Sequence, residues 1–118
     1  MIPTQYVSFP KDGEEEIFNY SRIDAEDRFF DFFGINIIEG RGFHLGEAAN
    51  PNASSYDPFR GRPVVLNETA MREFGEATKY MNVVGVAKDF LIMPTLKMKP
   101  VIIVAPPDPG IFYSFYYK

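Results

Sequence analysis

The sequence predicts an α+β fold, in which a mixed sheet carries two short helices packed on it and a long loop insertion. Three observations lead to this prediction. Short apolar runs of strand length recur along the chain, two segments carry the capping residues of helices, and the region from His44 to Arg62 is rich in Gly, Ala, Asn, Pro, Ser and Asp without periodicity. With 118 residues and a hydrophobic content of 46%, residues 1–118 are expected to form a single domain around one core.

The first half of the chain is expected to hold a strand, a helix and a second strand. Met1–Gly13 contains prolines and a glycine, and it is interpreted as a polar lead. Glu16–Ile23 alternates in the manner of a strand. Asp24 is a candidate N-cap for a helix that ends at Gly34, and Ile35–Ile38 is predicted to form the next strand.

The second half is predicted to contain a strand, a helix and then further strands. Asn67 is the expected N-cap of a helix that ends at Gly75, with Phe74 among the residues that face inward. Gly85 lies within an apolar run, which is typical of a bulge or of a close approach between backbones. Strands are expected at Pro63–Leu66, Met81–Ala87, Val101–Ala105 and Ile111–Tyr117.

Charge and composition exclude several classes of protein. A net charge of -4 and scattered basic residues argue against a nucleic-acid partner. The chain has no cysteine, and therefore no disulfide framework and no thiol nucleophile. No apolar run approaches the roughly 18 residues that span a bilayer, and Met1–Gly13 lacks the pattern of a signal peptide, so this chain itself is expected to be soluble.

The candidate catalytic residues do not form a recognisable constellation. His44 is the single histidine, and no neighbouring pattern completes a triad or a metal site around it. The carboxylates between Asp24 and Asp31 are interpreted as a solvated face and as helix-capping groups. No glycine-rich run has the ending of a nucleotide loop. We therefore expect a protein that is not an enzyme and that binds no cofactor and no metal.

Arg41 stands between two glycines, and two interpretations remain open for it. Its guanidinium is suited to clamp a ligand carboxylate, but an ion pair with a local acid such as Asp89 is favoured. Tyr56 and Phe59 belong to the long loop and are also candidate contacts for a partner or ligand.

The last aromatic run supplies two more candidate contacts, Tyr113 and Tyr116. Aromatic residues occupy both parities of Ile111–Tyr117, so both faces of a strand there need cover. An unpaired edge strand is a template for another strand, which makes a homodimer through this C-terminal strand a further expectation.

Four motifs in a fixed order give the chain a family likeness. They are Phe30–Phe43, Val64–Ala70, Val83–Phe90 and Pro100–Ile102. Together they resemble the MacB-like periplasmic core domain of FtsX-type ABC transporter permeases, with a match over about residues 24–117. The family domain starts before the position of Met1 and continues beyond the aromatic run, so the resemblance implies that the chain is a central piece of such a domain.

The resemblance implies a non-catalytic role in transport. In that family the domain lies at the periplasmic face of the inner membrane, between the first two transmembrane helices of the permease, and a separate cytoplasmic ATP-binding subunit or domain does the ATP chemistry. The implied partners are therefore the parent permease's transmembrane helices, that ATP-binding unit, and a periplasmic protein or lipoprotein. The alternative is a free-standing periplasmic domain that binds a small anionic ligand through Arg41 and the tyrosines.

Overall fold

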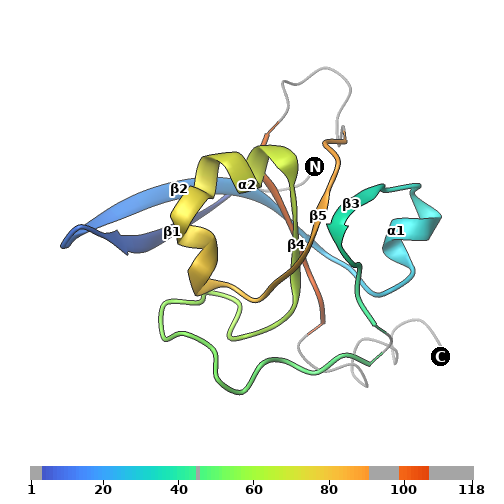
Figure 1. The fold of residues 1–118 in the computed structure, drawn as a ribbon, viewed down its shortest axis with the longest axis horizontal. Helices are drawn as coiled ribbons and strands as arrows, with labels where there is room; N and C mark the ends of the chain where they lie inside the picture. Colours follow the sequence, from blue (N-terminus) through green and yellow to red (C-terminus); the bar gives the residue numbers. More distant parts are fainter. Residues whose placement is uncertain (1–3, 45, 91–98, 107–118) are drawn as a thin grey trace.

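The computed structural model of the chain describes residues 4–44, 46–90 and 99–106, and it contains one six-stranded mixed sheet (Figure 1). The strands lie in the order β1-β2-β6-β4-β5-β3, with β2 parallel to β6, β4 parallel to β5, and the other neighbours antiparallel. The predicted α+β class with a mixed sheet is confirmed. The strands are β1 (Thr4–Lys11), β2 (Glu14–Asp24), β3 (Ile37–Gly40), β4 (Val64–Asn67), β5 (Val83–Ala87) and β6 (Val101–Val104).

A helical crossover joins the parallel strands β4 and β5, as parallel pairing requires. It consists of α2 (Glu68–Phe74) and the 3-10 helix η1 (Gly75–Tyr80), which lie on one face of the sheet (Figure 1). The Asn67 side chain accepts a hydrogen bond from the Ala70 N–H at 2.9 Å, and Gly75 follows the last turn with φ of 53°. Both predicted ends of this helix are therefore confirmed.

Two apolar clusters cover the two faces of the sheet. Because side chains alternate along a strand, Leu66 and Ile102 join the cluster under α2, while Val65 and Ile103 join the opposite one. All four residues are 0% exposed. Strands β4 and β6 are buried on both faces, which explains why their sequences are continuous apolar runs.

The interpretation of Met1–Gly13 as a polar lead is wrong, because Thr4–Lys11 forms β1. This strand pairs along its whole length with β2, from Thr4 opposite Ser21 to Lys11 opposite Glu14. Asp12 and Gly13 make the two-residue turn with φ of 51° and 81°, the left-handed geometry that hairpin turns of this kind need.

The predicted helix from Asp24 to Gly34 is also wrong in its extent. Only α1 (Phe29–Phe32) is helical there, and Asp24 ends β2 opposite Val104 instead of capping a helix. Its carboxylate accepts from Arg22 Nε at 3.1 Å. Pairing of β2 with β6 overrides the local capping signal, and the next strand lies at Ile37–Gly40, two residues later than predicted.

The predicted strands Pro63–Leu66, Met81–Ala87 and Val101–Ala105 are confirmed with small shifts of their bounds. The described residues of the long loop between Phe43 and Pro63 contain turns but no helix or strand. The expected strand Ile111–Tyr117 lies outside the described residues. Within the part of the chain that the structure describes, no helix has the length and apolar composition needed to cross a membrane.

Replacement of Asn67 by alanine is expected to destabilise the fold strongly. Asn67 is 0% exposed, and its side chain also accepts from the Val101 N–H at 3.0 Å and donates to the Lys99 carbonyl at 2.9 Å. Asn67→Ala leaves the buried N–H groups of Ala70 and Val101 without their acceptor, so urea unfolding should show a loss of about 2–4 kcal/mol in the free energy of unfolding. Asn19→Ala, at an exposed strand position, is the matched control and should cost at most about 0.5 kcal/mol. Equal losses in the two variants would contradict this role of Asn67.

Candidate functional site

A groove lies between the β1–β2 hairpin and the α2–η1 crossover. Its volume is about 430 Å³, which falls in the range of about 300–1,000 Å³ typical of small-molecule sites. Its lining comes from residues 9–12, 16, 18, 72–77, 79 and 80.

Four aromatic rings form the floor of the groove. Phe9 and Tyr80 stack with their ring centroids 5.5 Å apart, and Phe18 and Phe74 stack at 4.7 Å. Strand alternation places Phe9 and Phe18 on the face under α2, and Phe74 ends that helix. Phe9 and Phe74 are buried beneath the groove, whereas Phe18 and Tyr80 remain partly exposed and offer ring surface to a ligand.

The sheet supports only one end of the hairpin. In β2, Ser21–Asp24 pair with β6, whereas Glu14–Tyr20 have β1 as their sole strand neighbour among the described residues. The hairpin therefore projects past the sheet (Figure 1), and its aromatic contacts with Phe74 and Tyr80 hold it against the crossover. The two walls of the groove thus belong to structural units that meet mainly through side chains.

Charged groups surround the aromatic floor. Lys11 is paired with Glu16 at 3.3 Å, and the Lys79 ammonium lies 5.3 Å from the centroid of the Tyr80 ring. The remaining acids of the lining are Asp12, Glu73 and Glu76, and none of them makes an ion pair with another described residue. Aromatic faces combined with charges of both signs are suited to recognition of a ligand.

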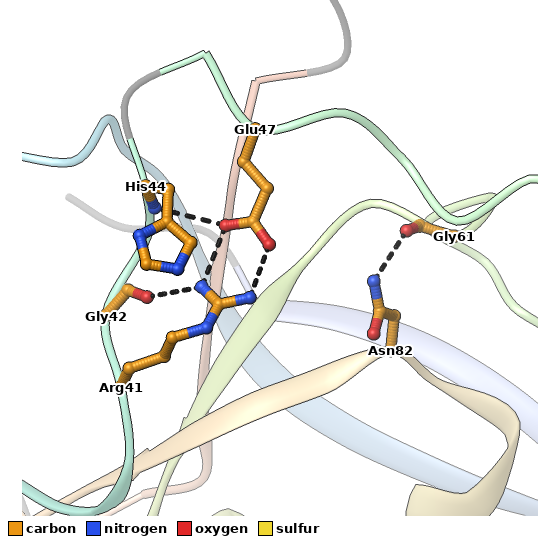
Figure 2. A network of polar contacts seen from close by, with 6 residues as sticks. All are labelled: Arg41, Gly42, His44, Glu47, Gly61 and Asn82. Atoms are coloured by element: carbon orange, nitrogen blue, oxygen red, sulfur yellow. Dashed lines mark hydrogen bonds and ion pairs between the residues drawn. The ribbon is translucent and has the colours of Figure 1, made fainter.

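Arg41 lies in a different place, beside the long loop (Figure 2). Its two terminal nitrogens donate to the two carboxylate oxygens of Glu47, at 2.9 and 2.6 Å, and one of them also donates to the Gly42 carbonyl. The expected pair of Arg41 with Asp89 is therefore wrong. Asp89 instead accepts from the N–H and the hydroxyl of Thr69, both at 2.9 Å, at the start of α2.

The Arg41–Glu47 pair alters the protonation of both groups. The hydrogen bonds from Arg41 lower the pKa of the Glu47 carboxyl, and burial opposes this effect without cancelling it. The same hydrogen bond raises the pKa of the Arg41 guanidinium. Glu47 thus engages both terminal nitrogens of Arg41, and an anionic ligand would compete with this carboxylate for them.

The backbone of Gly85 lies against the backbone of Arg41. A Cβ at this position would collide with the Arg41 backbone, and the pairing of β4 with β5 shifts register at the same point. The close backbone approach and the irregularity expected for Gly85 are both confirmed. This contact places Arg41 where its N–H donates to the Val84 carbonyl at 3.0 Å.

The other candidate contacts are distributed differently. Tyr56 is 54% exposed, and its ring meets Tyr80 at 5.4 Å, so it extends the aromatic surface of the groove. Phe59 is 1% exposed and packs against Tyr20 at 6.0 Å, which places it in the core, out of reach of a partner. Tyr113 and Tyr116 lie outside the described residues.

The long loop is anchored by polar groups around Phe59. Asp57 accepts hydrogen bonds from the N–H groups of Phe59 and Gly61, both at 2.8 Å. Arg62 donates to the Ala105 carbonyl at 2.9 Å, and burial lowers the pKa of its guanidinium.

His44 is exposed at the start of the long loop, and its backbone N–H donates to Glu47 at 3.1 Å (Figure 2). Among the described residues, no group of three or more His, Asp or Glu is placed to hold a metal ion.

The groove residues were not identified from the sequence. Phe74 was expected to face inward, but Phe9 belonged to the supposed polar lead and Tyr80 to a segment without a predicted element. The usable signal was Asp12-Gly13 between alternating apolar residues, which is the pattern of a hairpin.

Comparisons of the chain with protein-family models, with curated proteins and with solved structures found no match.

Replacement of Glu47 by glutamine is expected to destabilise the protein in a manner that depends on pH. The pKa of Glu47 is lowered in the folded state, so its contribution is present above the ordinary value of 4.5 and is lost as the pH falls through the folded value. At pH 7, Glu47→Gln should lower the free energy of unfolding by about 1 kcal/mol. Urea unfolding between about pH 7 and pH 3 should show this difference shrink at the acid end.

Glu39→Gln provides the control for this measurement. Glu39 is exposed and makes no ion pair with a described residue. Its substitution should therefore leave stability nearly unchanged at every pH. A cost of Glu47→Gln that stays constant down to pH 3 would show that the ionised pair is not its cause.

Proposed function

We propose that the chain is a non-catalytic periplasmic domain of an ABC transporter permease, which couples movement of the membrane helices to an extracytoplasmic substrate or partner protein. One observation carries this proposal. The four motifs that resemble the family fall on β3, on β4 with the start of α2, on β5 and on β6, and these strands are consecutive neighbours in the sheet. The four motifs thus lie together on four consecutive strands of the sheet.

These four strands and α2 are suited to move together as one rigid body. Strands β4 and β6 are buried on both faces, and hydrogen bonds of Asn67 connect β4 to α2 and to β6. A rigid body does work in a transport cycle only if a ligand or partner binds differently to its two positions. The groove and Tyr56 supply a surface for such differential contacts.

The groove also favours a second candidate function, a free-standing periplasmic domain that binds a small ligand. Its volume of about 430 Å³ is sufficient for a small molecule. The predicted contact between Arg41 and an anionic ligand does not support this alternative, because Glu47 already engages the terminal nitrogens of Arg41.

The protein encoded by the complete gene is expected to contain apolar spans of about 20 residues on both sides of the segment described by this sequence. This expectation follows from a position between two membrane helices, and the coding region together with cell fractionation checks it. Recovery of the segment with the inner membrane and protection from protease added to the cytoplasmic side would support the proposal. A stop codon directly after Lys118 with no upstream span would overturn it in favour of the free-standing domain.

A functional test uses that complete permease. Tyr56→Ala combined with Glu76→Gln removes an exposed ring beside the groove and a charge of its lining, and should reduce transport while ATP hydrolysis without substrate is retained. Asn19→Ala combined with Glu15→Gln, at exposed positions that do not line the groove, is the matched control. Unchanged transport in the first variant would contradict a role for this surface.

A further inference from the structure

We propose that the groove between the hairpin and the crossover binds a small amphipathic organic cation, a primary ammonium group on an apolar body. The inference deepens the proposed function, on which its role in transport rests, but binding itself is a property of the chain alone. Three features of the groove lead to it: the Lys79 ammonium at its aromatic floor, more carboxylates than cations in its lining, and apolar ring surface of suitable extent.

The first feature is the contact between Lys79 and Tyr80. The Lys79 ammonium lies 5.3 Å from the centroid of the Tyr80 ring, within the distance at which a ring attracts a cation. The Tyr80 ring is fixed in position, since it stacks on Phe9 with an interplanar angle of 6° and meets Tyr56 edge-on. The floor of the groove is thus preorganised to receive an ammonium group, and the Lys79 ammonium already occupies such a position over the Tyr80 ring.

The second feature is the balance of charge in the lining. Glu16 neutralises Lys11 at 3.3 Å, which leaves Arg72 and Lys79 as cations against Asp12, Glu73 and Glu76. These three acids form no ion pair within the described part of the chain. With three carboxylates against two cations, the rest of the lining is negative by one charge, and a ligand cation that displaces Lys79 meets these carboxylates.

The third feature is the apolar surface beside these charges. Phe18 and Tyr80 keep part of their rings exposed, and the buried pair Phe9 and Phe74 supports them from below. A volume of about 430 Å³ accommodates an ammonium together with a ring or short alkyl body. The exposed ring surface contacts the apolar body of a ligand, and the carboxylates attract its ammonium head group. We therefore infer that the ligand is an amphipathic cation.

The test compares three probes that share one body. Phenethylamine, 2-phenylethanol and 3-phenylpropionate are titrated into the 118-residue chain, and backbone amide shifts are followed by NMR. Phenethylamine should shift the amides of residues 9, 11, 12 and 72–80, and it should bind at least about threefold more tightly than the neutral alcohol, with the carboxylate weakest. Equal affinity of the amine and the alcohol, or shifts confined to other residues, would overturn the proposal.

Charge variants assign the effect to the groove. Glu73→Gln with Glu76→Gln should weaken phenethylamine binding by about three- to tenfold, because each removes an attraction of an exposed carboxylate for the ammonium. Lys79→Gln should strengthen it, because the substitution clears the Tyr80 face and removes a like charge. Glu14→Gln combined with Glu15→Gln removes the same two charges at exposed positions outside the groove and should leave affinity unchanged. A Lys79→Gln variant that binds the amine more weakly would contradict the proposed displacement.

The outcomes separate this inference from the proposed function. Membrane spans around the segment together with no amine binding would leave the permease proposal standing and refute the ligand class. Selective amine binding without such spans would support the groove as a cation site in a free-standing domain.

Discussion

The buried side chain of Asn67 holds the arrangement of this fold together. It ends β4, caps α2 through the Ala70 N–H, and fixes the start of β6 through the Val101 N–H and the Lys99 carbonyl. An apolar residue would leave the buried N–H groups of Ala70 and Val101 without this hydrogen-bond acceptor. The Asn67 carboxamide thus fixes the start of the crossover to β4 and β6.

A second polar contact fixes the same crossover from the other side. Asp89, which follows β5, accepts from the Thr69 N–H and hydroxyl, and its own N–H donates to Glu68 at 3.1 Å. The start of α2 is thus attached to both strands that the crossover connects. Because α2 is held in this direction, Phe74 and Tyr80 come to lie over Phe9 and Phe18, and the groove is a consequence of the crossover geometry.

The parts of the structure that sequence reasoning predicts are those set by local signals. Asn67 and Gly75 mark the ends of α2, and the apolar runs of β4, β5 and β6 identify buried strands. Asp24 misled the prediction, because a carboxylate before a possible helix carries the same signal when long-range pairing makes it a strand end. The groove escaped prediction for a related reason: Phe9 and Tyr80 are far apart in sequence, and no local pattern reports that they stack.

The groove lies at the boundary between two parts of the fold that are held in different ways. The crossover is fixed to the central strands by hydrogen bonds of Asn67 and Asp89, whereas Glu14–Tyr20 of the hairpin pair only with β1 among the described strands. The position of the hairpin relative to the crossover depends on contacts between aromatic rings. Such contacts permit small displacements at a lower cost in free energy than a hydrogen-bonded strand pair does. A ligand that touches Tyr80 on one wall and Phe18 on the other stabilises one spacing over others. Occupancy of the groove is then coupled to the position of the hairpin relative to the sheet, which is the differential binding that a domain needs to transmit motion.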